Sequence, residues 1–241
     1  MKWFSGLSFK ARVFLGCLLV ALVPLTFSSV VMTRLFTVSL NRQIASEGAR
    51  QMEEISLRLT QLLENCEKAC DTLTADGSAS WVMIDNKTVE IQKDLYLSLY
   101  QAVQEIYSHA QFSIYDAGGK LRFTTDTAPK NSALPVYWGL LKKASVGSGI
   151  TYYRVDPYLS RSNSTTIMQG AYSLENSHGA RTGYVVLDFT RENFDNLLNG
   201  FYSAGDTLLV LDSHQKPLYC SRPEYGEDQI GDMILHTVSG Q

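Results

Sequence analysis

Six side chains in the second half of this sequence have the types that line small-molecule sites. They are Tyr137, Trp138, Tyr152, Arg154, Tyr172 and Asp188. Aromatic rings with a few charged groups among them are typical of ligand pockets, and a buried carboxylate suits a cation. In the strand predicted around Asp188, alternation puts Tyr184, Val186 and Asp188 on one face. We therefore predict a ligand site in which Asp188 is a charged contact.

These residues also have a plain structural interpretation. Aromatic side chains in strands mostly fill the core. Asp188 precedes Arg191, where a helix is predicted to begin, so its carboxylate is also suited to end the strand or cap that helix. The two interpretations differ in the direction and the partners of the side chain.

Residues that would carry catalysis are scattered along the chain. The sequence has no His-x-x-x-His pair, no Gly-x-Ser-x-Gly turn and no phosphate loop, because Gly147-Ser-Gly149 lacks a following Lys. The histidines stand apart, at His109, His178, His214 and His236. We expect a binding module with no cofactor and no chemistry of its own. An anchored hydrolase is an alternative that requires a Ser or Asp to meet one of these histidines in a cleft.

The cysteines and the net charge exclude two further classes. The cysteines are Cys17, Cys66, Cys70 and Cys220. Their spacing fits neither a zinc site nor a dense disulfide framework, so apolar packing and a bridge from Cys66 or Cys70 to Cys220 both remain open. A net charge of −3 provides no basic surface for nucleic acid.

An uncharged run from Val13 to Thr33 predicts a transmembrane helix. Its 21 residues span about 31 Å as a helix, close to the thickness of a bilayer's hydrocarbon core. The run is longer than the apolar region of a cleaved signal peptide, the alternative interpretation. Lys2, Lys10 and Arg12 precede it, which predicts a cytoplasmic N-terminus and an exterior that begins near residue 41.

Periodicity predicts an α+β domain beyond this span. Apolar residues at steps of three and four from Ile44 to Leu73 indicate a long helix that either lies against a domain or pairs with a second copy through Met52, Leu59, Cys66 and Leu73. Further helices are predicted at 89–109, around 138–144 and from Arg191. Strands are predicted in a hairpin at 111–125 and at 150–155, 166–174 and 182–189, which together make a five-stranded antiparallel sheet.

A hairpin pattern occurs twice. Asp116, Lys120 and Phe123 are matched by Asp212, Lys216 and Tyr219, each at an offset of 96 residues. The repeat predicts two similar lobes, of which the second lacks strands and leaves its hairpin with an unpaired apolar face. The predicted divisions are a tail (1–12), a transmembrane helix (13–33), a long helix with the first lobe (34–205) and an incomplete second lobe (206–241).

These features together resemble a known family. The lead Ser8-Phe-Lys-Ala-Arg12, the span containing Val23-Pro24-Leu25, the long helix and the repeated hairpin are similar to the double Cache (PAS-like) sensor region of bacterial transmembrane receptors, most of all YesM-type sensor histidine kinases. The resemblance implies that the chain stops before a second transmembrane helix, a HAMP linker and a kinase module. Methyl-accepting chemoreceptors and cyclic-di-nucleotide cyclases carry similar sensors.

The resemblance also implies partners and a place for the ligand. Asp188, in Gly183-Tyr-Val-Val-Leu-Asp188, matches the late strand Asp that the amino-acid-binding subset uses on a ligand amine, whereas the Arg and Trp-Tyr part of that pattern is absent. We expect an extracytoplasmic sensor anchored in the cell membrane. Its expected partners are a small-molecule ligand or an extracytoplasmic binding protein, and a second copy in a homodimer. A membrane-anchored assembly protein that uses the Met52 to Leu73 stripe as a coiled coil is the remaining alternative.

Overall fold

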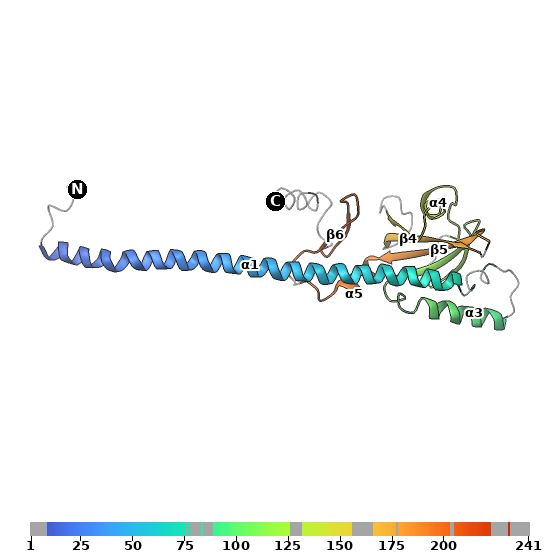
Figure 1. Ribbon diagram of the computed structural model, residues 1–241, viewed down its shortest axis with the longest axis horizontal. Coiled ribbons are helices and arrows are strands. Elements are labelled where there is room, and N and C mark those ends of the chain that lie inside the picture. The colour runs from blue at the N-terminus through green and yellow to red at the C-terminus, as the bar shows by residue number, and fades with distance from the viewer. Residues whose placement is uncertain are drawn as a thin grey trace. The chain divides into compact units, whose positions relative to one another are not determined.

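The computed structural model divides into two compact units, residues 1–53 and 54–241. It describes residues 9–75, 77, 83, 89–125, 132–155, 166–176, 178–202, 205–222 and 231. Most of the tail predicted at 1–12 and most of the chain after residue 222 lie outside the described residues. Helix α1, Phe9–Ala75, contributes to both units (Figure 1).

The first unit consists of the N-terminal part of α1, and its composition suits a lipid environment. Its large apolar side chains, such as Phe27 and Met32, are exposed. The hydroxyl of Thr26 donates to the carbonyl of Leu22 at 2.9 Å, and that of Thr33 donates to Ser29 at 2.8 Å. Such bonds satisfy polar side chains where no water is present. Among the described residues, α1 is the one helix long and apolar enough to cross a membrane.

The second unit is built on a five-stranded antiparallel sheet, as predicted. The strands are β1 (Gln111–Asp116), β2 (Leu121–Thr124), β3 (Thr151–Arg154), β4 (Thr166–Glu175) and β5 (Arg181–Thr190), in the order β2-β1-β5-β4-β3. The central strand β5 is buried along eight consecutive residues, Gly183 to Thr190, because it has a neighbour on each side and packing on both faces. The α+β fold class is therefore confirmed.

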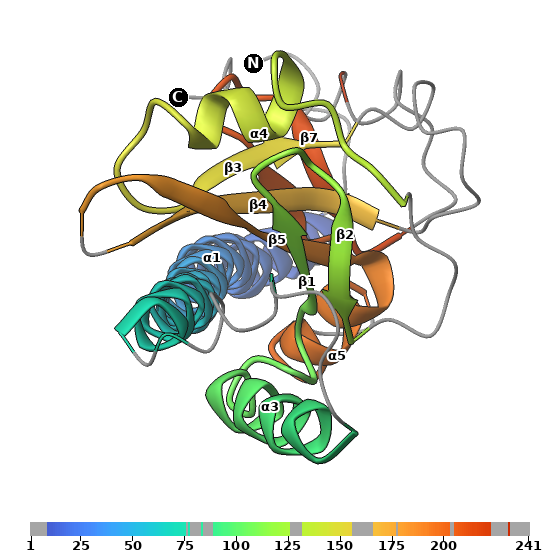
Figure 2. The same ribbon diagram turned by 90° about the vertical axis from the view of Figure 1, so that its right-hand side faces the viewer.

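Helices cover the two faces of the sheet unequally. Helix α3 (Val89–Ala102), helix α5 (Arg191–Leu198) and the part of α1 after residue 53 lie on one face, and the short helix α4 (Gly139–Ala144) lies on the other (Figure 2). The larger core fills the first face and includes Val185 and Leu187 of β5. A smaller cluster under α4 includes Tyr184 and Val186. Alternation along β5 thus separates the two cores.

The apolar stripe of α1 packs against the sheet. Its buried members are Ile55, Leu62, Cys66, Ala69, Cys70 and Leu73. The coiled-coil interpretation is therefore wrong for Cys66 and Leu73, which have 0% and 1% of their surface exposed, whereas Met52 is 49% exposed. All four cysteines are free, so a bridge to Cys220 does not form.

The helix predicted at 89–109 is shorter than expected, whereas the helix predicted from Arg191 begins at that residue. The helix expected at 89–109 ends at Ala102 and continues as tight turns, in which the amide of His109 donates to the carbonyl of Ile106 at 2.9 Å. Helix α5 begins with a capping box in which Thr190 Oγ1 accepts from the amide of Asn193. Because Thr190 is the N-cap, the interpretation of Asp188 as the helix cap is wrong.

The 96-residue repeat is confirmed in hydrogen-bond detail. Strands β6 (Leu209–Leu211) and β7 (Pro217–Cys220) form the second hairpin. In its turn Asp212 Oδ1 accepts from the amides of His214 and Lys216 at 2.8 and 2.9 Å. In the first hairpin Asp116 Oδ1 accepts from Gly118 and Lys120 at 3.0 and 2.9 Å. The same local sequence chemistry thus builds the same turn twice.

The expected exposed apolar face of the second hairpin is not found. Leu208 and Tyr219 are 4% and 2% exposed and belong to the larger core of the second unit. The expectation failed because the repeat describes the hairpin's own bonds and says nothing of what packs on it. The boundary at residue 205 stays a prediction.

Candidate functional site

Asp188 lies near the end of the central strand, on the face that α4 covers. It shares this face with Tyr184 and Val186, as alternation predicts, and is 3% exposed. It is the one described Asp or Glu that is buried. A carboxylate removed from water in this way requires polar or charged partners.

The partners of Asp188 come from the strands on either side of it. Gln111 of β1 and Gln169 of β4 lie directly opposite Asp188 in the sheet register. Gln169 Nε2 donates a hydrogen bond to Asp188 Oδ1 at 2.6 Å. Burial and the nearby charge of Asp188 raise the pKa of Tyr115 to about 12. The result is a polar row across three strands with a carboxylate at its centre.

Helix α4 is held against this face by two cationic side chains. Arg181 Nη2 donates to the carbonyl of Ser145, which follows α4, at 2.7 Å. Lys143 Nζ lies 4.4 Å from the centre of the Tyr153 ring, a cation–π distance. Arg181 is seven residues from Asp188 on the same strand, or about 23 Å. The guanidinium of Arg181 therefore binds the segment at the end of α4 and is too far away to pair with Asp188.

Two of the predicted site residues lie on the opposite face of the sheet. Tyr152 packs in the larger core, with its ring 6.2 Å from that of Phe189. The hydroxyl of Tyr172 donates to Asp71 of α1 at 3.0 Å. Burial raises the pKa of both phenols. Neither ring shares a face with Asp188, because each is one residue out of phase with it in the sheet register.

Of the other three predicted residues, one is in phase with the opposite face of the sheet and two are exposed. Arg154 follows Tyr152 by two residues, so it is in phase with the face that carries the larger core. Hydrogen bonds from the amides of Lys216 and His214 lower the pKa of Asp212, and the charges of His214 and Arg154 contribute less. Tyr137 and Trp138 immediately precede α4 and are 88% and 71% exposed. The structure therefore does not bring the six residues together, and their ligand roles stay predictions.

Sequence reasoning missed the two glutamines that flank Asp188. A signal for Gln169 was present, since it is a polar residue inside a strand whose neighbours Met168 and Gly170 are apolar. Its pairing with Asp188 depends on the register between β4 and β5, which has irregularities at Thr166/Met168 and Leu174/Glu175. Such bulges change which residues face each other and are not visible in the sequence.

Metal-binding and reactive-thiol chemistry find little support in the part of the chain that is described. No group of three His, Cys, Asp or Glu side chains there could hold a metal ion. Burial raises the pKa of Cys66 to about 12, and that of Cys70 also rises, so both remain thiols. What the described face offers is a buried carboxylate, which can bind a cationic group.

Comparison with known proteins identifies the fold. No protein-family model matches the sequence, and no curated protein matches it significantly. The sensor domain of the V. cholerae histidine kinase DctB has a TM-score of 0.55 and 13% identity, over 80% of this chain and 75% of that one. The sensory domain of the Campylobacter jejuni chemoreceptor Tlp3 with isoleucine bound has a TM-score of 0.53 and 13% identity, over 81% and 80%. The ligand-binding domain of Tlp3 with 4-methylisoleucine has a TM-score of 0.52 and 13% identity, over 76% and 73%. The chain has the fold of the sensor domains of a histidine kinase and of a chemoreceptor.

Proposed function

We propose that this chain is the ligand-sensing part of a membrane-anchored receptor, with its site on the α4 face of the sheet around Asp188. The shared fold supports a sensor. The single observation that carries the site is the buried carboxylate of Asp188 between Gln111 and Gln169. A carboxylate binds an ammonium group through charge-assisted hydrogen bonds, and an acidic side chain inside a folded domain is a candidate for such a role.

The proposed ligand is a small molecule with an ammonium group. Asp188 provides the negative charge for it, and Gln169 orients one carboxylate oxygen. Isoleucine, which Tlp3 binds in its solved structure, has such a group. Neither Arg154 nor Arg181 is assigned to a ligand carboxylate. Arg154 is in phase with the opposite face of the sheet, and Arg181 binds the carbonyl of Ser145. The proposal therefore specifies the ammonium and leaves the rest of the ligand open.

The proposed receptor has its N-terminus in the cytoplasm and the second unit outside the membrane, and it forms a homodimer. Its output is proposed to be a histidine kinase module of the YesM type, since a histidine kinase sensor is among the structures of this fold. A chemoreceptor output is the alternative, supported equally by Tlp3. The reading frame beyond residue 241 distinguishes these outputs.

A thermal-shift screen tests the site. The chain in detergent is heated with amino acids, amines and matched compounds that lack the ammonium group. Asp188→Asn removes the charge while keeping the shape, and Asp71→Asn is the matched control, because Asp71 is also a hydrogen-bonded aspartate but lies on the other face. We expect ammonium compounds to stabilise the natural chain and the control, and to lose about 10- to 100-fold in affinity with Asp188→Asn, the value of a hydrogen bond to a charged group.

Two results would contradict the proposal. Equal stabilisation of the Asp188→Asn and Asp71→Asn variants would make Asp188 structural. Loss of the ligand effect in Tyr172→Phe, with Asp188→Asn unaffected, would move the site to the face that α1 covers.

A further inference from the structure

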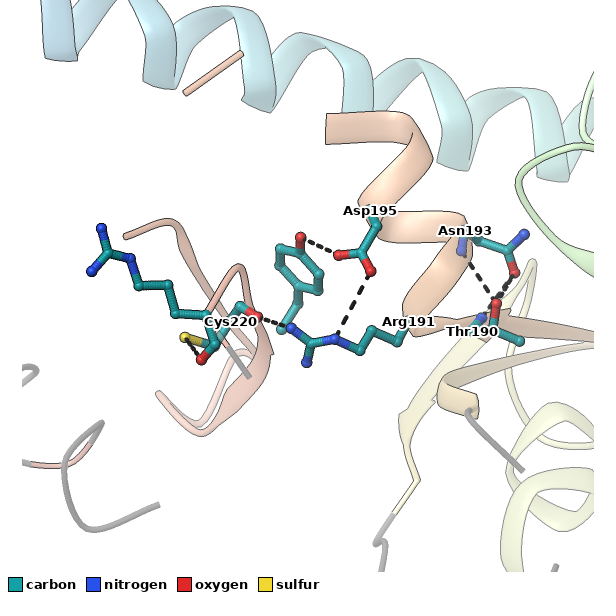
Figure 3. Close-up of polar contacts among 7 residues, drawn as sticks. Thr190, Arg191, Asn193, Asp195 and Cys220 are labelled. Atoms are coloured by element: carbon teal, nitrogen blue, oxygen red, sulfur yellow. Dashed lines mark hydrogen bonds and ion pairs between the residues drawn. The ribbon is translucent and has the colours of Figure 1, made fainter. Parts of the chain in front are cut away.

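The second hairpin contacts helix α5, which begins three positions after Asp188 in the chain. Residues from helix α5 hold strand β7, and we call this contact the α5–β7 joint, made of Arg191, Asp195, Tyr219 and Cys220 (Figure 3). At the turn of the hairpin, the amide of Lys216 does most to lower the pKa of Asp212, and the charge of Arg154 at the end of β3 contributes to lowering it. Arg154 and the start of α5 both lie at the end of the sheet that contains the row of Asp188.

The joint is a closed polar network around a buried ring. The hydroxyl of Tyr219 donates to Asp195 Oδ1 at 2.6 Å, and its ring lies 5.5 Å from the ring of Phe194. The guanidinium of Arg191 donates to the carbonyl of Cys220 and lies 5.4 Å from the centre of the Tyr219 ring. Burial and Asp195 raise the pKa of Tyr219, which keeps its hydroxyl a donor. Each side of the joint therefore holds the other at several points.

Arg191 of the joint lies three positions after Asp188 in the chain. Strand β5 ends at Thr190 and α5 begins at Arg191, so no loop separates the strand from the helix. Thr190 and Asn193 close a capping box across this junction, and Phe189 is fully buried. The end of β5 and the start of α5 are therefore one continuous, hydrogen-bonded segment.

We propose that the α5–β7 joint couples the state of the Asp188 site to the hairpin β6–β7, so that the hairpin is the element that responds when the site is filled. This inference rests on the proposed function, because it assigns a regulatory consequence to the same site. Coupling between two places is reciprocal, so a change at the joint also alters the site. Asp188→Asn removes the negative charge of the side chain, which a bound cation would neutralise.

Amide hydrogen exchange of the full chain in detergent tests the coupling without a ligand. The reporters are the amides of Asp212 and Ser221, which donate to the carbonyls of Lys216 and Leu208 within the hairpin at 2.9 Å each. The reference amide is that of Val103, which donates to Leu99 at 3.2 Å. Glu105→Gln is the control variant, an exposed carboxylate changed to an amide.

Coupling predicts that Asp188→Asn speeds exchange at Asp212 and Ser221 by about fivefold or more, and that Glu105→Gln does not. In the Tyr219→Phe background, which lacks the bond to Asp195, the same change should have less than about half that effect. If Asp188→Asn also speeds exchange at the reference amide of Val103, the second unit has opened as a whole. The Gln169→Met variant, which removes only the donor to Asp188, then replaces Asp188→Asn in the test.

The inference is overturned if the hairpin amides respond no more to the Asp188 or Gln169 change than to Glu105→Gln. It is also overturned if the response is the same with and without the Tyr219 hydroxyl. Neither readout requires that a ligand be known, so a failed ligand screen and a failed coupling test are separate results.

Discussion

Replacing Tyr219 by alanine tests whether hairpin β6–β7 belongs to the same folded core as the five-stranded sheet. The ring is 2% exposed and stacks on Phe194, so its removal leaves a cavity between the hairpin and α5. Truncation of a buried aromatic side chain costs about 3–5 kcal/mol. For a domain the size of the second unit, each kcal/mol lowers Tm by about 2–4 °C, so Tyr219→Ala should lower Tm by about 6–20 °C.

Tyr219→Phe separates the contribution of the hydroxyl to stability from that of the ring, and Leu211→Ala is a control in the same hairpin. Tyr219→Phe keeps the ring and removes the bond to Asp195, whose side chain is 48% exposed, so water replaces much of the bond and the cost is about 1 kcal/mol. Leu211→Ala alters the same hairpin at a residue that is 37% exposed and should cost less than about 1 kcal/mol.

The assay is thermal unfolding of the full chain in detergent, followed by circular dichroism, with exchange of the β5 amides as a second measure confined to the sheet. If Tyr219→Ala lowers Tm and β5 protection no more than Leu211→Ala does, the hairpin does not share the core of the sheet. The structural argument for the joint would then fail.

Four other predictions follow from the described residues. Gly183→Ala should cost about 1–3 kcal/mol in urea unfolding, because a Cβ there would meet Met83 and the carbonyl oxygen of Tyr115, while Gly205→Ala, with nothing within 4 Å, should stay within about 0.5 kcal/mol. Cys66 and Cys70 should react with a thiol reagent at pH 8 only after unfolding, since burial raises the pKa of both thiols; reaction in the folded chain would contradict their burial. Although burial opposes it, the amide of Lys120 and the side chain of Arg122 lower the pKa of Asp116, so its contribution to stability is complete above about pH 5 and declines as the pH falls below about 4. Urea unfolding across this range should show a weaker pH dependence for Asp116→Asn than for the natural chain. Protease added to intact cells should digest the chain from about residue 41 onward and spare the N-terminal tail; protection of the C-terminal part would reverse the proposed topology.

The sheet could be predicted from the sequence because its signals are local. Alternation and the Gly118-Gly119 turn located the first hairpin, and the strands at 150–155, 166–174 and 182–189 were each within one residue of their observed ends. Helix ends were less predictable. The helix expected to end at His109 changes to tighter turns after Ala102, while Val103 and Ile106 remain fully buried, so the apolar spacing continued beyond the regular helix.

The site was only partly predictable for a geometric reason. Alternation within β5 correctly put Tyr184, Val186 and Asp188 on one face. The face of Tyr152 relative to Asp188 depends on the pairing of β3 with β4 and of β4 with β5, and a shift of one residue in either pairing reverses it. Sequence alone therefore gives the direction of a side chain within its own strand, whereas a pocket requires directions across several strands.

Helix α5 packs against both the five-stranded sheet and the hairpin β6–β7, and the repeat explains why. In the first hairpin Phe123 packs against Tyr96 and Tyr100 of α3, with ring centres 5.2 and 5.8 Å apart. Tyr219, which is 96 residues later, packs against Phe194 of α5 instead. Helix α5 thus covers the second hairpin as α3 covers the first, while its buried Leu197 and Leu198 remain in the core of the sheet. A boundary drawn where the sequence repeat begins would pass between α5 and the hairpin that it covers. For this reason the start of a sequence repeat need not coincide with the boundary of a part that folds independently.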